Sequence, residues 1–294
     1  MSQIVSSQQR ADQDGTLVAH QRGVELAIAC MRESFGEPLA LDDLADVAFM
    51  SRYHFNRVFT KIAGVSPCRF LAAIRMQEAK RLLLKTHRSV TDISLDVGYN
   101  SLGTFTRIFA DFVGFAPVRF RQLAVPLRSM EVSTAITFLH KQQEISPSAP
   151  VVGEVRCSNP LSLIIVGMFQ VAIPRSDPTE CTVLQGTTRF AFDSRPRRGW
   201  RIYAAGLLPG ASLEDAMLAT RGSVLVGSTI LDSIDGQHGD ISVELREGRT
   251  IDPPVVVAFP LILLESVLGR RLGYLEEAAK TADPRLYGRP TSID

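Results

Sequence analysis

The sequence predicts a multi-domain protein. An all-α N-terminal domain, in which a long helix joins two helix-turn-helix units, precedes a mainly-β domain that we expect to be a β-sandwich. Three observations predict this: apolar residues recur at helical spacing over residues 20–125, one pattern occurs twice there, and short β-rich runs follow residue 150. We expect residues 1–19 to form a disordered arm, residues 126–150 a linker, and residues 151–294 a regulatory or assembly domain.

An internal repeat defines the two helix-turn-helix units. Residues 46–70 and 96–120 align without a gap and share ten identities in 25 positions. The identical pairs are Asp46 and Asp96, Val47 and Val97, Ser51 and Ser101, Phe55 and Phe105, Arg57 and Arg107, Phe59 and Phe109, Gly64 and Gly114, Pro67 and Pro117, Arg69 and Arg119, and Phe70 and Phe120. Such self-similarity indicates one supersecondary unit used twice.

Start and stop signals set the individual helices. Ser51 is the expected N-cap of a helix that ends before Gly64, and Ser66 and Pro67 open a longer helix through Lys85. The second copy repeats these signals. The expected helices cover residues 24–31, 41–48, 52–63, 67–85, 91–97 and 101–113, and a seventh begins at Pro117.

Turn-forming residues divide the C-terminal part into short apolar runs, which is typical of strands. Eight strands are expected, over residues 151–157, 161–169, 181–185, 189–192, 200–207, 224–230, 241–245 and 255–259. Only residues 213–219 and 275–279 have helical patterns there. Eight strands with short connections favour a β-sandwich.

The second helix of each unit has an apolar side and a polar side. In a helix-turn-helix this helix enters the DNA major groove, where arginine pairs with guanine and asparagine with adenine. In the first copy we expect the base-facing residues to be Arg52, Tyr53, Asn56 and Arg57. The second copy keeps Arg107, but its remaining groove-side residues offer fewer donors, so we expect weaker base recognition there.

Phosphate contacts are expected next to these helices, because they position a protein on DNA without specifying sequence. We assign Lys61 and Arg88 to this role, with Ser51 and Ser101 at the starts of the two recognition helices. An alternative exists for Arg57 and Arg107, each of which would merely pair with a nearby acid such as Asp46 or Asp96.

The charge distribution favours a polyanion-facing surface in the helical part. Residues 49–88 contain nine Lys or Arg and one acid, Glu78. Residues 151–294 contain fifteen Lys or Arg and seventeen Asp or Glu, a net charge of −2. Double-stranded DNA is therefore the expected partner. A solvated helix face is the alternative, although it would normally mix the two signs.

The helical pattern closely resembles the AraC/XylS family of bacterial transcription regulators over about residues 20–124. The residues that carry the resemblance include Leu44, Ala45, Ser51, Phe55, Arg57, Phe59, residues 64–67, Phe70, Arg75, residues 79–83, Ile93, residues 97–99, Phe105, Arg107, Phe109, Gly114, Pro117, Phe120 and Arg121. The resemblance implies two recognition helices in successive major grooves. It implies base-facing positions for Tyr53, Asn56 and Arg57, and for Gly103, Thr106 and Arg107. Most members carry this domain at the C-terminus, so a different sensor is attached here.

The β-rich half offers no nucleophile motif, phosphate loop or metal-spaced histidine pair, and the four cysteines are scattered. We therefore expect no enzymatic activity, no cofactor and no metal. An effector sensor for a small apolar or anionic ligand, and an assembly module for a homodimer or for RNA polymerase, remain open, with a fused enzyme as a third possibility. The competing class is a metabolite-binding protein or enzyme with a helical scaffold.

No secretory signal is visible in the first eighteen residues, and no apolar run has the length of a membrane span. We expect a cytoplasmic, nucleoid-associated protein without membrane contact.

Overall fold

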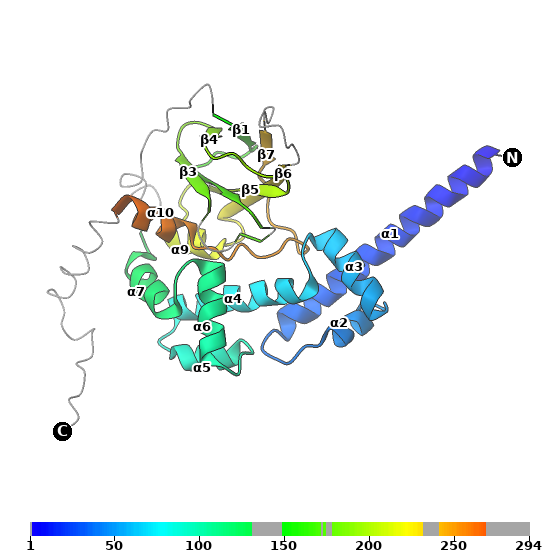
Figure 1. Cartoon of the computed structure of the whole chain (residues 1–294), viewed down its shortest axis with the longest axis horizontal. Coiled ribbons are helices and arrows are strands. Elements are labelled where there is room, and N and C mark those ends of the chain that lie inside the picture. The colour runs from blue at the N-terminus through cyan, green and yellow to red at the C-terminus, as the bar shows by residue number, and fades with distance from the viewer. Residues whose placement is uncertain (1, 131–148, 172, 175–177, 232–240, 269–294) are drawn as a thin grey trace.

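The computed structural model describes residues 2–130, 149–171, 173–174, 178–231 and 241–268, and Figure 1 shows their arrangement. All seven expected N-terminal helices are present. They are α1 (Ser2–Glu33), α2 (Leu41–Val47), α3 (Arg52–Ala63), α4 (Pro67–Lys85), α5 (Val90–Asp96), α6 (Leu102–Val113) and α7 (Pro117–Leu127). The long α4 lies between the two helix-turn-helix units, α2–α3 and α5–α6, as the repeat predicts.

The helix boundaries follow the predicted signals. Gly64 and Gly114 cap α3 and α6 in the left-handed conformation, with φ of 73° and 93°. Glycine adopts this conformation without steric strain and therefore ends a helix well. Pro67 and Pro117 take the first positions of α4 and α7, where the missing N–H has no helical partner to lose.

The N-terminal arm was expected to be disordered, and the structure contradicts this. Residues 2–19 belong to α1, whose first half projects away from the rest of the molecule (Figure 1). The segment contains no proline, and its Gln, Ala and Arg residues have good helix propensity. Polar composition therefore did not distinguish a helix from disorder in this segment.

The C-terminal half consists mostly of strands in two sheets. Its strands are β1 (Val151–Arg156), β2 (Leu163–Phe169), β3 (Glu180–Leu184), β4 (Arg189–Phe192), β5 (Trp200–Leu207), β6 (Val224–Leu231) and β7 (Ile241–Glu244). One sheet has the order β4-β1-β7 and the other β3-β2-β5-β6. Neighbouring strands are antiparallel except β1 and β7, which are parallel. Both sheets contribute to one apolar core.

The prediction of an eighth strand over residues 255–259 is wrong. The backbone N–H of Ala258 donates to the carbonyl of Val113 in α6, 3.0 Å away, rather than to a strand. Phe259 then begins α10 (Phe259–Leu268), and Pro260 stands in its first turn. The apolar residues of this run are buried between the two halves of the molecule. Both a buried strand and a buried loop would bury them, so the apolar run alone does not identify the backbone conformation.

The second apolar core joins the helical half to the four-stranded sheet. It extends from the helices through α9 (Leu213–Leu218) and α10 to the outer face of β2. Phe169 of β2 meets Phe259 with ring centroids 5.4 Å apart, and a Cβ at Gly167 would stand 2.7 Å from the same Phe259 ring. Strand β2 is buried along its whole length because its two faces contribute to the two cores.

The expected helix at residues 213–219 is confirmed as α9, whereas that at 275–279 lies outside the described residues. Of the expected linker, residues 131–148 also lie outside them. Just before this gap, the carbonyls of Arg128 and Met130 accept hydrogen bonds from the backbone N–H groups of Glu214 and Leu213, each 3.0 Å long. Among the helices that the structure describes, none is long and apolar enough to cross a bilayer.

Candidate nucleic-acid interface

Buried phenylalanines hold the two recognition helices, α3 and α6, against the long helix and α7. In the first unit Phe59 lies between Phe55 and Phe70, with ring centroids 5.5 Å from each. In the second unit Phe109 meets Phe120 at 5.8 Å. Such aromatic pairs contribute about 0.5–1.5 kcal/mol beyond the burial of their area. The repeated phenylalanines therefore fix the apolar sides of both helices and leave the opposite sides exposed.

The exposed side of α3 carries the four base-facing residues predicted for the first unit. Arg52, Asn56 and Arg57 are exposed, and Tyr53 has 87% of its surface accessible. Arg52 forms an ion pair with Asp42, with Nη1 and Oδ2 3.4 Å apart. The guanidinium of Arg57 contacts the ring of His54 at 3.4 Å.

The exposed side of α6 is poorer in donors, as predicted. Gly103 has no side chain, and a Cβ added there would meet nothing within 4 Å. Thr106 is half-buried, and Arg107 is exposed. Ser101 accepts a hydrogen bond from the Thr104 backbone N–H at 3.4 Å, so its hydroxyl caps the helix. Ser51 is the N-cap residue of α3 but forms no side-chain capping bond, and its side chain is exposed.

The ion-pair alternative for Arg57 and Arg107 finds no support among the described residues, where neither forms a salt bridge with a carboxylate. Asp96, the candidate partner of Arg107, instead pairs with Arg88, whose Nη2 lies 2.9 Å from Oδ1. The Arg88 carbonyl also accepts a bond from Arg121 at 2.7 Å. Arg88 thus has a structural partner that the sequence did not predict, whereas Lys61 is exposed on α3.

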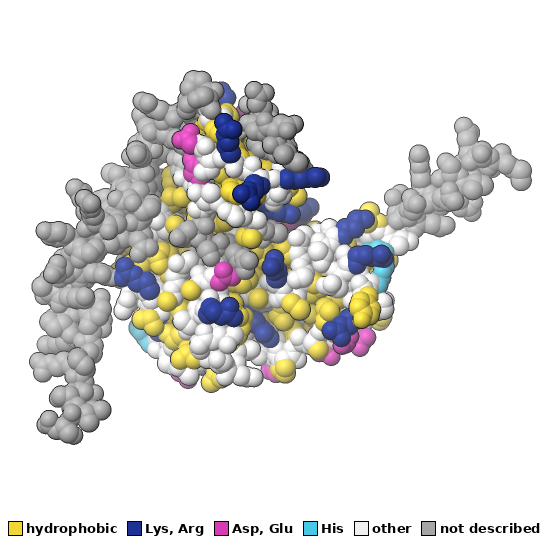
Figure 2. Space-filling view, viewed as in Figure 1, with side chains coloured by type: hydrophobic (Ala, Val, Ile, Leu, Met, Phe, Trp, Pro, Cys, Tyr) yellow, Lys and Arg dark blue, Asp and Glu magenta, His cyan; other side chains and the backbone are white. Residues whose placement is uncertain are grey.

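Several Lys and Arg residues of the basic block, residues 49–88, stabilise the fold and are not free to form a binding surface. Arg75 donates to the carbonyls of Phe35 and Glu37, at 2.8 and 2.9 Å. Arg81 pairs with Glu78 of its own helix, and Lys85 pairs with Glu214 of α9 at 2.9 Å. Lys80 is completely buried. On the face shown in Figure 2, Lys and Arg side chains are dispersed and do not form one continuous patch. The block's net charge therefore overstates the charge available to a polyanion.

A histidine pair beside α3 is a feature that the sequence did not predict. The Nε2 atoms of His20 in α1 and His54 in α3 are 3.1 Å apart, and the rings meet edge to face. The two residues are 34 positions apart in different helices, so no local spacing could signal the contact. Because His54 also contacts Arg57, this pair connects α1 to the recognition helix.

Comparison with known proteins matches residues 44–123 to a family model described as "Helix-turn-helix domain". The match spans both repeat copies. Residues 44–123 are an AraC-type helix-turn-helix domain. The AraC-type domain lies in the N-terminal part of this chain, before the strands.

Two relatives match part of this chain at 34% identity. The bifunctional transcriptional activator/DNA repair enzyme AdaA of Bacillus subtilis matches over 101 residues, 34% of this chain and 48% of its own length. An uncharacterized HTH-type transcriptional regulator of Haemophilus influenzae matches over 116 residues, 39% of either chain. The matched part of this chain therefore spans less than half the length of either relative.

Solved structures are similar to about a third of the chain. An AraC-type regulator from Chromobacterium violaceum aligns at 27% identity with a TM-score of 0.34, over 35% of this chain and 91% of its own. The DNA-binding domain of AdpA, solved in complex with a target DNA, aligns at 27% identity with a TM-score of 0.35, over 36% and 96%.

Proposed function

We propose that this chain is a transcription regulator that binds specific DNA through its N-terminal AraC-type domain. The observation that carries the proposal is that two equivalent recognition helices, α3 and α6, each expose an arginine, Arg57 and Arg107, that has no carboxylate partner among the described residues. Guanidinium groups without a carboxylate partner on such helices suit bidentate contacts to guanine. The family match to residues 44–123 supports the same function.

Within this function, Arg52, Tyr53, Asn56 and Arg57 of the first unit face bases, together with Gly103, Thr106 and Arg107 of the second. Lys61 and Ser51 contact phosphates, and we keep Arg88 and Ser101 as phosphate contacts of secondary weight because Asp96 and the Thr104 N–H already engage them. The two recognition helices enter successive major grooves on one side of the duplex.

The β-rich half acts as the regulatory part, and its two sheets form a β-sandwich around their shared core. Its extensive packing against α4, α6 and α7 supports a role in controlling the DNA-binding half rather than a separate enzymatic activity. A small-molecule effector is the preferred partner. A second copy of the chain and RNA polymerase are further candidates, and the protein acts in the cytoplasm at the nucleoid.

The deciding experiment is a mobility-shift assay with the full chain on genomic fragments, at a stated salt concentration because phosphate contacts are salt-dependent. We expect a small set of fragments to be retained in the presence of excess non-specific DNA. Equal retention of all fragments would contradict sequence-specific binding. No retention at low salt would contradict DNA binding altogether and favour the metabolite-binding scaffold.

A further inference from the structure

We propose that the cavity between the helical half and the β-rich half is a binding site for a small organic anion that carries a carboxylate or phosphate group. The regulatory role of this cavity rests on the DNA-binding function proposed above, whereas anion binding by the cavity does not.

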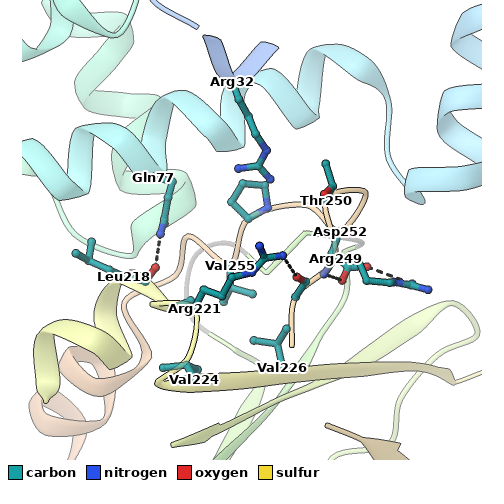
Figure 3. A pocket seen from close by; sticks show the side chains of 13 residues that line it. Arg32, Gln77, Leu218, Arg221, Val224, Val226, Arg249, Thr250, Asp252 and Val255 are labelled. Carbon is teal, nitrogen blue, oxygen red and sulfur yellow. Dashed lines mark hydrogen bonds and ion pairs between the residues drawn. The ribbon is translucent and has the colours of Figure 1, made fainter. Parts of the chain in front are cut away.

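The cavity is built by both halves of the molecule (Figure 3). The helical half contributes Arg32 from the last turn of α1 and Gln77 from α4. The β-rich half contributes the end of α9, strand β6 and residues 248–255. The volume is about 430 Å³, within the range of small-molecule sites.

Positive charge dominates the cavity wall. The lining includes three arginines, Arg32, Arg221 and Arg249, and one acid, Asp252, so the charged side chains sum to +2. The Asp252 carboxylate is already engaged, since Arg246 reaches it at 2.6 Å and Arg249 at 3.3 Å. It is therefore unable to neutralise the two remaining arginines.

Arg32 and Arg221 face the cavity from opposite halves of the molecule (Figure 3). Burial and the nearby Arg221 guanidinium both lower the pKa of Arg32. Arg221 donates one hydrogen bond, to the Gly248 carbonyl at 2.9 Å, and neither arginine has a salt bridge within the described residues. Two guanidinium groups that repel each other across an interface form a site that an anion would stabilise.

The rest of the wall indicates an organic ligand rather than a simple inorganic ion. Val224, Val226, Pro254 and Val255 provide the apolar part of the lining. Ligand sites typically combine such apolar lining with a few polar groups that fix orientation. Gln77 adds a polar group: its Nε2 donates to the Leu218 carbonyl, while its Oε1 is buried without a hydrogen-bond partner among the described residues.

Occupation of the cavity would link ligand binding to the arrangement of the DNA-binding half. An anion held by Arg32 and Arg221 bridges α1 to the β-rich half, and Gln77 lies on the helix that joins the two recognition units. A ligand that prefers this docked arrangement shifts the equilibrium toward it. The site is therefore placed to act on the spacing of the two recognition helices.

The test measures the Tm of the full chain and, by titration calorimetry, its affinity for citrate and for inorganic phosphate. Sodium chloride at matched ionic strength is the reference. Citrate tests the carboxylate class, phosphate the phosphate class, and glycerol serves as the neutral solute. We expect one of the two anions to raise the Tm in a saturable manner. Arg32→Gln and Arg221→Gln should each weaken that binding roughly tenfold or more, whereas Arg198→Gln, on an exposed turn outside the cavity, should leave it unchanged.

Circular dichroism confirms that each variant is folded. Absence of a saturable shift with either anion, or equal loss in all three variants, would overturn the proposal. A mobility shift on the same preparations separates the two hypotheses. A chain that binds DNA but neither anion refutes only the site, and a chain that binds the anion but no DNA refutes only the proposed regulator function.

Discussion

The amino group of Lys80, in the middle of the helix that joins the two DNA-binding units, donates a 2.7 Å hydrogen bond to the backbone carbonyl of Val256 in the β-rich half. The same amino group donates to the carbonyl of Met217, near the C-terminus of α9. One buried side chain therefore holds two segments of the β-rich half against α4. Helix carbonyls at a C-terminus lack intrahelical donors, so the contact also caps α9.

Lys80 makes the stability of the molecule depend on pH above neutrality. Burial lowers the pKa of its amino group from 10.5 to about 7. Between these values the unfolded chain holds a proton that the folded chain has released, so the free energy of unfolding rises with pH. The slope is about 1.4 kcal/mol per pH unit. Below pH 7 the amine is protonated in both states, and this contribution is constant.

Denaturant unfolding at pH 6, 7, 8 and 9 checks this expectation. Lys80→Met removes the titrating group, so the difference in free energy of unfolding between the wild type and this variant should change between pH 7 and 9. Lys61→Met, at an exposed position on α3, is the matched control and should follow the wild-type profile. Parallel profiles for the wild type and Lys80→Met would show that burial does not shift this amine.

Arg57 and Lys61 should contribute to DNA binding in different ways, although both are exposed on α3. Arg57→Ala should reduce discrimination at one base position by about 1–3 kcal/mol. Lys61→Ala should weaken binding to all sequences similarly and lower the salt slope by about 1. Competition mobility shifts at several salt concentrations measure both effects. If Arg57→Ala instead weakened every sequence equally, Arg57 would be a phosphate contact.

The helical half was predictable because its signals are local. Gly64, Pro67, Gly114 and Pro117 mark helix ends within a few residues, and the repeat relates one unit to the other. The same logic failed for residues 255–259, since an apolar run reports burial but not conformation. Their position depends on Val113 of α6, more than a hundred residues away.

The candidate sites were only partly predictable. The exposed side of α3 follows from helical spacing, and so do its base-facing residues. The partners of Lys80 do not, because they stand 137 and 176 positions further along the chain. For the same reason Lys80 counts toward a basic surface in the sequence, although the structure buries it. The cavity near Arg32 also depends on residues that only the docking of the two halves brings together.

Substitution by alanine should change the free energy of unfolding in opposite directions at two exposed glycines of the helix-turn-helix units. Gly103 lies within α6 with open space around it, so Gly103→Ala should raise the free energy of unfolding by roughly 0.5–1 kcal/mol. Gly64 caps α3 at a φ of 73°, so Gly64→Ala should lower it by about 1–2 kcal/mol. Chemical denaturation of both variants provides the comparison. A stabilising Gly64→Ala would contradict the left-handed cap.

The two recognition helices should differ in how far their base preference depends on one arginine. On α6 the neighbours of Arg107 are Gly103, which has no side chain, and the half-buried Thr106. Arg107→Ala should therefore abolish base preference in the half-site that α6 contacts. Arg57→Ala should leave a weaker preference in the other half-site, because Arg52, Tyr53 and Asn56 remain exposed on α3. Selection of binding sites from random DNA with each variant measures this, and Gln122→Ala on the exposed surface of α7 serves as the control. A preference that survives Arg107→Ala in the second half-site would mean that Thr106 or the backbone near Gly103 recognises bases directly, since no other base-facing residue was assigned to α6.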